Sequence, residues 1–144
     1  MDNKKVKKRR ILQALLGKPF ALGDSSKGFD CFFMSYYYLY LLGNKLPREW
    51  KGVSLRGYKK IRDENVNKAR ELMFDFMKEH TDGTDNNIQF GDILRLKPKF
   101  NPSKPDFLAI YNGKGNIIAA SVRKGICIMN LYDYKILDIY RSKK

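Results

Sequence analysis

The chain has 144 residues, about the length of one domain, and 43% of them are hydrophobic and 13% aromatic. This composition excludes a wholly disordered chain, and two cysteines are too few for a disulfide-stabilised scaffold. No apolar run approaches the roughly 18 residues of a membrane-spanning helix. The apolar stretch 11–16 is also shorter than the core of a secretory signal. We therefore expect a protein that begins near Met1 and is made in a reducing cytoplasm.

Positive charge is concentrated at the two ends of the chain. The net charge is +14, and more than half of it lies in residues 1–10 and 141–144. We expect these segments to be mobile basic tails on a single domain spanning residues 11–140. Such tails attract a nucleic acid, an acidic lipid or an acidic protein equally well, and they could also serve only solubility. The basic residues of the first tail are Lys4, Lys5, Lys7, Lys8, Arg9 and Arg10.

Two helices are predicted in the first third of the chain. A short helix over 11–16 ends at Gly17. The second helix covers 29–42 and is apolar nearly all round, so it must be packed on most sides. Asp30 is a suitable N-cap and Gly43 a suitable C-terminal residue, which favours this helix over an unusually long buried strand.

A third, amphipathic helix is predicted over 63–80, with Asp63 as its cap and the only histidine, His80, at its end. Its apolar residues recur at the spacing of one helix face. They are Ala69, Leu72, Met73, Phe76 and Met77. The opposite face, which we expect to be solvated, carries Lys68, Arg70, Glu71, Asp75, Lys78 and Glu79. The polar segment 81–87 predicts a loop.

The rest of the chain has the short, β-branched runs of a sheet. The predicted strands cover 93–97, 107–111, 117–121, 126–131 and 136–140. A turn is predicted at Pro98, Pro102 and Pro105, and residues 112–115 predict a hairpin. Helices followed by an antiparallel meander define an α+β fold.

Five segments occur in a distinctive order along the chain. They are LGKPFALGDSSKGFDCFF, LGNKLPR, FGDILRLK, FLAIYNGKGNIIAAS and GICIMNL. In this order they resemble the NlpC/P60 family of papain-like cysteine peptidases, whose members cut peptidoglycan stem peptides. The resemblance covers residues 16–131. It implies a papain-like fold in which a Cys-bearing helix packs on an antiparallel sheet, with residues 58–87 as an insertion.

The resemblance places Cys31 at the position of the family's nucleophile. A helix N-terminus favours the thiolate, but the reaction also needs an imidazole and a third polar group that orients it. Phe107 stands at the position of the imidazole and Ala119 at the position of the third group. Neither side chain can take or give a proton, so the resemblance implies a catalytically inactive relative.

The substrate-binding positions also depart from the family. Phe32 and Phe33 replace a Ser-Gly pair after the nucleophile, and Leu22 replaces a tyrosine of the upstream loop. We expect these three residues to fill or remodel the cleft. Asp106 could supply a base, but its side chain on a strand would point to the opposite face from its neighbour at the imidazole position. Nothing in the sequence places His80 near the nucleophile.

The leading interpretation is a structural or binding module without enzymatic activity, metal or cofactor. Because members of the family also occur in phage tails, the most specific version is a phage tail or virion component that contacts other subunits. Two alternatives stay open. One is an active peptidase or amidase that attacks peptidoglycan through Cys31 with a non-standard base, and the other is a basic nucleic-acid-binding protein. The stripe of Met73, Phe76 and Met77 either packs on the domain or docks a partner.

Overall fold

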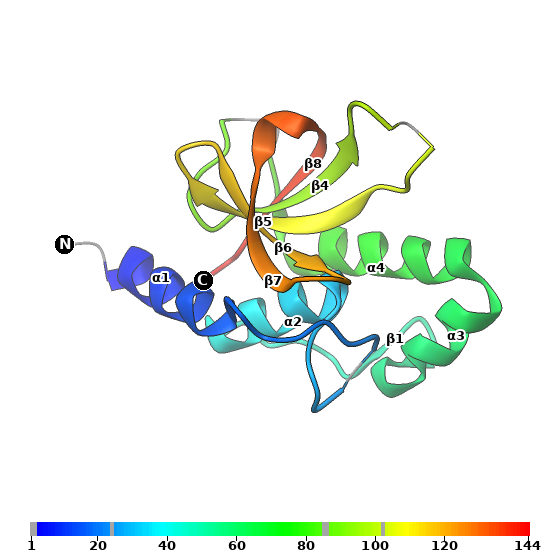
Figure 1. Ribbon diagram of the computed structural model, residues 1–144. Coiled ribbons are helices and arrows are strands. Elements are labelled where there is room, and N and C mark those ends of the chain that lie inside the picture. Colours follow the sequence, from blue (N-terminus) through cyan, green and yellow to red (C-terminus); the bar gives the residue numbers. More distant parts are fainter. Residues whose placement is uncertain (1–2, 24, 85–86, 102) are drawn as a thin grey trace.

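The fold is a six-stranded antiparallel sheet with helices packed against one face (Figure 1). The helices are α1 (Asn3–Leu15), α2 (Cys31–Leu41), α3 (Tyr58–Glu64) and α4 (Val66–His80). The strands of the sheet, in spatial order, are β3 (Asp82–Gly83), β8 (Tyr134–Arg141), β4 (Ile93–Pro98), β5 (Phe107–Gly113), β6 (Asn116–Ser121) and β7 (Gly125–Asn130). The remaining elements are a small ribbon of β1 (Glu49–Trp50) and β2 (Val53–Ser54) and the 3-10 turns η1 (Leu55–Gly57) and η2 (Leu131–Asp133).

The computed structural model describes residues 3–23, 25–84, 87–101 and 103–144. Residues 1–2 of the first predicted tail, 85–86 of the predicted loop and Pro102 of the predicted turn lie outside the described residues. Within the described ranges, no helix combines the length and the apolar character needed to cross a membrane.

Both faces of the sheet are buried. Because side chains alternate along a strand, Leu108 and Ile110 of β5 pack against the helices, whereas Ala109 packs on the opposite face with Leu94 and Leu131. The predicted α+β fold is therefore confirmed. The meander holds for β4 to β7, and β8 then crosses back to pair with β4.

Helix α2 begins where its predicted cap places it. The Asp30 carboxylate accepts hydrogen bonds from the backbone N–H groups of Phe33 and Gly23, both at 2.8 Å. Gly28 lies so close to the chain ahead of it that a Cβ atom there would be 2.1 Å from the carbonyl oxygen of Pro19. Only glycine fits such an approach. These contacts hold the first turn of α2, and with it the cysteine, in place.

The prediction of a mobile first tail is wrong for residues 3–10, because they form the first turns of α1. The helix is anchored at its C-terminal end by the buried side chains of Leu12 and Leu15. Nearer its start, Lys5 and Arg9 lie over the ring of Phe90, with the cations 5.9 and 5.6 Å from the ring centroid.

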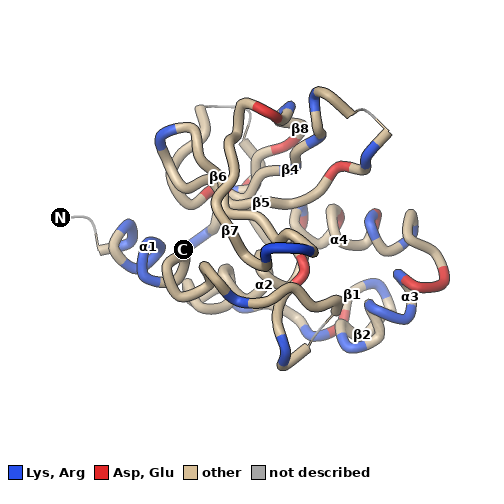
Figure 2. Tube along the Cα trace, viewed as in Figure 1, with Lys and Arg blue, Asp and Glu red and all other residues tan. Residues whose placement is uncertain are grey.

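The basic residues predicted to contact a partner therefore belong to a helix. Figure 2 shows the concentration of positive charge along α1. Besides the two cations over the aromatic ring, this helix carries Lys4, Lys7, Lys8 and Arg10.

The chain that follows α1 pairs with the outer edge of β7. The N–H of Gly17 donates to the carbonyl of Ile126 at 2.9 Å, and the N–H of Ile126 donates to the carbonyl of Lys18 at 2.8 Å. Since β7 is the last strand of the sheet, these two hydrogen bonds cover part of a free strand edge.

The second predicted tail begins inside the sheet. Arg141 is the last residue of β8, and its Nε and Nη2 atoms donate to the carboxylate of Asp92 at 3.0 and 2.9 Å. The side chain of Asp92 is only 2% exposed. Arg141 is therefore a structural residue, and the chain beyond the strand consists of residues 142–144.

The predicted helix over 63–80 is two helices, α3 and α4, separated at Asn65. The cap of α4 is Asn65 and not Asp63, because the Asn65 side chain accepts a hydrogen bond from the N–H of Lys68 at 3.1 Å.

The apolar stripe of α4 is part of the core. Met73, Phe76 and Met77 are buried, and the ring centroid of Phe76 lies 5.3 Å from that of Phe32 and 5.9 Å from that of Trp50. The prediction that these three residues dock a partner is wrong, since the inserted helix packs over α2.

Candidate functional site

Cys31 is the first residue of α2, and its side chain faces the inserted helices. Its thiol donates a weak hydrogen bond to Sδ of Met73 at 3.8 Å. Sδ of Met73 also accepts a hydrogen bond from the hydroxyl of Tyr58 at 3.9 Å. A thioether is a weak acceptor that does not take up a proton. The group that holds the thiol therefore cannot act as its base.

Burial raises the pKa of the Cys31 thiol to about 11, and the neighbouring carboxylate of Asp30 adds to the rise. The positive charge of Arg62 acts in the opposite direction and offsets only part of it. Cysteine peptidases attack with the thiolate, whereas this thiol is protonated at neutral pH. The N-terminus of α2 alone does not activate it.

Alkylation should report this state directly. At pH 7.5 we expect iodoacetamide to modify Cys31 roughly a hundredfold more slowly than a free thiol, because the thiolate fraction is lower by about that factor. The rate should still be rising at pH 10. Mass spectrometry of the Cys31 peptide measures it, with Cys127 as an internal reference, and a rate that levels off near pH 8 would contradict the raised pKa.

A cavity of about 220 Å³ opens beside Cys31. Its polar lining residues are Asp30, Cys31, Tyr58, Arg62, Arg70 and Asp106. From the upstream loop, Phe20 lines the cavity. Leu22, which was predicted to remodel the cleft, is half-buried and is not among its lining residues.

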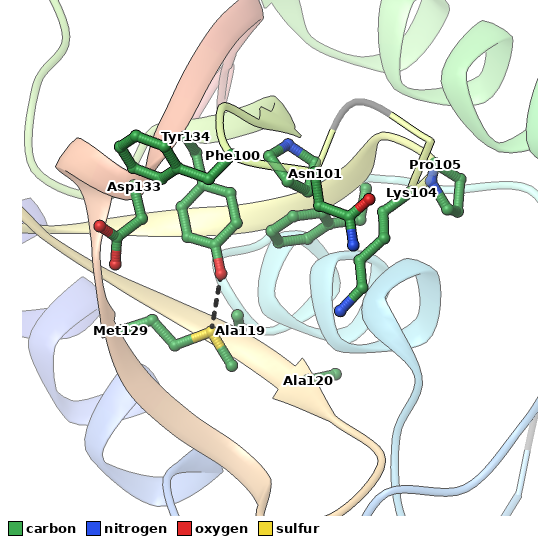
Figure 3. A pocket seen from close by; sticks show the side chains of 11 residues that line it. Phe100, Asn101, Lys104, Pro105, Ala119, Ala120, Met129, Asp133 and Tyr134 are labelled. Carbon is green, nitrogen blue, oxygen red and sulfur yellow. Dashed lines mark hydrogen bonds between the residues drawn. The ribbon is translucent and has the colours of Figure 1, made fainter.

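Phe107 and Ala119 come together, but in a second cavity. Phe107 begins β5, and its ring packs edge-on against Tyr134 with 5.2 Å between centroids. Both residues line a cavity of about 450 Å³ that also includes Met129 (Figure 3). Phe107 and Ala120 border both cavities. Phe107 and Ala119 pack in the apolar cluster on the face of the sheet away from α2, so the position expected for the imidazole borders the Cys31 cavity without directing its ring at the thiol.

The second cavity is mostly apolar. The hydroxyl of Tyr134 is used in a 3.6 Å hydrogen bond to Sδ of Met129, and Phe100 at the rim is 85% exposed. Its charged lining residues are Lys104 and Asp133, which lie on opposite sides in Figure 3. Such a cavity suits an apolar group better than a proton-transfer step.

Asp106 and Phe107 face opposite sides of the sheet, as alternation along a strand predicts, but Asp106 is the one on the side of the thiol. Phe107 packs in the apolar cluster on the face away from α2, whereas Asp106 lines the Cys31 cavity. Its carboxylate forms ion pairs with Arg70 of α4 and Arg95 of β4. Asp106 is thus near the thiol but is engaged by two guanidinium groups.

His80 lies elsewhere. Its ring contacts Trp50 and Phe76, with centroids 4.8 and 4.5 Å away, and it lines a separate cavity with Lys45 and Lys143. Burial lowers its pKa below the ordinary value. Among the residues that the structure describes, His, Cys, Asp and Glu side chains form no group of three that could hold a metal ion.

The two rings after Cys31 are core residues. Phe32 and Phe33 are buried and lie edge-to-face, 5.0 Å apart. Both contact Tyr58 of α3, with centroids at 5.1 and 5.8 Å. They pack between α2 and the inserted helices and do not line the Cys31 cavity, contrary to the predicted remodelling of the cleft.

The sequence does not predict the arginines of the site. Its helical pattern places Arg70 on the solvated face, and nothing in the pattern marks Arg62. Both line the Cys31 cavity, and Arg70 is half-buried between Asp106 and the ring of Phe74. The sequence carries no signal that separates these two arginines from the other basic residues of the insertion.

A cysteine at the start of a buried helix that packs on an antiparallel sheet defines a papain-like cysteine peptidase fold. The sequence model of the NlpC/P60 family matches residues 17–141, so the chain belongs to the NlpC/P60 family, a class of cysteine peptidases. A search of curated proteins found no significant match.

Solved structures share this fold. NlpC2 and NlpC1 from Trichomonas vaginalis are 16% and 17% identical to this chain, with TM-scores of 0.64 and 0.65. The match covers 99% of this chain but 47% and 45% of theirs. An NlpC/P60 family protein from Bacillus cereus ATCC 10987 is 17% identical with a TM-score of 0.59, and the match covers 97% of this chain and 40% of that one. The chain therefore spans less than half the length of these proteins.

Proposed function

We propose that this chain is a catalytically inactive NlpC/P60 domain that serves as a structural or binding module. The surroundings of Cys31 carry the proposal. Its thiol is held by Met73 and has a pKa of about 11. Phe107 and Ala119 occupy the positions where the family resemblance expects the imidazole and its orienting group. The reaction needs a thiolate and a base, and these four residues supply neither.

Within this proposal, the module belongs to a phage tail or virion and contacts other subunits of that assembly. The occurrence of the family in phage tails supports this version. The basic residues of α1 would face an acidic or polyanionic surface of the partner, and such a contact weakens as salt is added.

One observation favours the active alternative. Asp106 lines the same cavity as Cys31, and its carboxylate is the candidate for the non-standard base. However, positive charge beside a carboxylate stabilises its ionised form and makes it a weaker base. Because Arg70 and Arg95 both pair with Asp106, the inactive module is the better supported function.

Incubation with peptidoglycan fragments tests the proposal. We expect the unaltered chain and the Cys31→Ala variant to give the same products, at the level of buffer alone, when the digests are compared by mass spectrometry. Circular dichroism confirms that the variant is folded. Release of stem-peptide fragments by the unaltered chain alone would overturn the proposal and establish a working hydrolase.

A further inference from the structure

The cavity beside Cys31 has a cationic corner built by the insertion. Arg62 of α3 and Arg70 of α4 both line it, together with Tyr58 and Met73. The corner is present because two helices, 58–64 and 66–80, close over the nucleophile position.

Arg62 is the cation of this corner that is available to a ligand. Among the residues that the structure describes, it has no ion pair or hydrogen bond, whereas Arg70 and Arg95 both pair with Asp106. Asp30, the other carboxylate of the cavity, accepts backbone hydrogen bonds at the start of α2. Neither carboxylate of the cavity therefore forms an ion pair with Arg62.

Arg62 lines the cavity together with Asp30, Cys31 and Tyr58. Its positive charge lowers the pKa of these three groups against the larger effect of burial. Arg62 is half-buried, so this charge is only partly screened by water.

One hydrogen-bond donor of the corner is unsatisfied. The Nε atom of Arg70 is buried and has no acceptor among the described residues. A buried donor without a partner is costly, and a ligand oxygen would satisfy it. The cavity lining also includes the apolar side chains of Phe20, Val66 and Val122.

We propose that this cavity binds the carboxylate of a small organic acid or of a peptide end, with Arg62 as its anchor. A guanidinium group matches the planar fork of a carboxylate. The apolar lining residues then accommodate the carbon skeleton of the ligand, which an inorganic anion lacks. The inference rests on the proposed function, because it assigns a ligand class to a site without chemistry at Cys31.

A matched pair of ligands tests the inference. The 15N-labelled chain is titrated with N-acetyl-L-valine and with N-acetyl-L-valinamide, which differ in the carboxylate alone, and with inorganic phosphate. We expect the acid to bind at least about tenfold more tightly than the amide, as a charge-assisted hydrogen bond allows. The shifted amide signals should include those of residues 31, 62 and 106–107. Equal binding of acid and amide, or equal binding of phosphate, would overturn the inference.

Three variants locate the anchor. Arg62→Gln should weaken binding of the acid about tenfold or more, and Arg62→Lys should lose part of the affinity, since it keeps the charge without the fork. Lys60→Gln removes the same charge from an exposed position of α3 and should bind the acid unchanged. The amide spectrum of each variant shows that it is folded. Unchanged binding by Arg62→Gln, or equal loss in Lys60→Gln, would contradict the anchor.

The outcome is separable from that of the peptidoglycan assay. Cleavage that depends on Cys31 would refute the inactive module while leaving acid binding to be measured in Cys31→Ala. Absence of acid binding would refute the ligand class while leaving the inactive module standing.

Discussion

Replacing Phe76 by alanine is expected to lower the free energy of unfolding by about 3–5 kcal/mol. The ring is fully buried and contacts Phe32, Tyr36, Trp50 and His80. Its removal leaves a cavity between α4 and α2 that rigid helices cannot fill. Urea unfolding followed by circular dichroism measures the loss.

Phe100→Ala is the matched control, because the side chain of Phe100 is 85% exposed. Its free energy of unfolding should change by less than about 0.5 kcal/mol. If Phe76→Ala cost as little as this control, the stripe of α4 would not be core, and its assignment as a docking surface would have to be restored.

The second large effect is expected at the end of β8. Arg141→Gln should lower the free energy of unfolding by about 3 kcal/mol, because it leaves the carboxylate of Asp92 buried without its cation. Among the described residues, the N–H of Gln89 would still donate to that carboxylate, at 2.8 Å. The measurement is again urea unfolding.

Lys143→Gln removes one positive charge two residues further along, at an exposed position. We expect no measurable loss of stability in this variant. Equal stability of the two variants would mean that Arg141 belongs to a basic tail, as the composition alone suggested, and not to the sheet.

Those parts of the fold that depend on local signals could be predicted from the sequence. The capping residue Asp30 and the glycine after α2 mark the ends of that helix, and the hairpin residues mark the turn between β5 and β6. The full extent of helix α1 could not be predicted from the sequence. Its buried leucines, Leu12 and Leu15, fall in its last turns, so its first turns carry no apolar periodicity and look like a charged tail.

The candidate site could likewise be predicted only in part. Cys31, Phe107 and Ala119 could be placed because a chain of motifs fixes their order. The ion pairs of Asp106 could not, because they join a loop before β5 to the inserted helix α4 and to β4. Such contacts depend on how distant segments pack and leave no pattern in the spacing of residues. The cationic corner at Arg62 was missed for the same reason.

The pairing of residues 17–18 with Ile126 has a consequence for how the molecule meets its neighbours. An uncovered outer strand offers backbone donors and acceptors to any passing chain, which leads to aggregation or strand exchange. Here the connection between the first two helices occupies those groups at one end of β7. A version of the chain shortened before residue 19 would lose more than a charged helix, since it would also expose that border of the sheet.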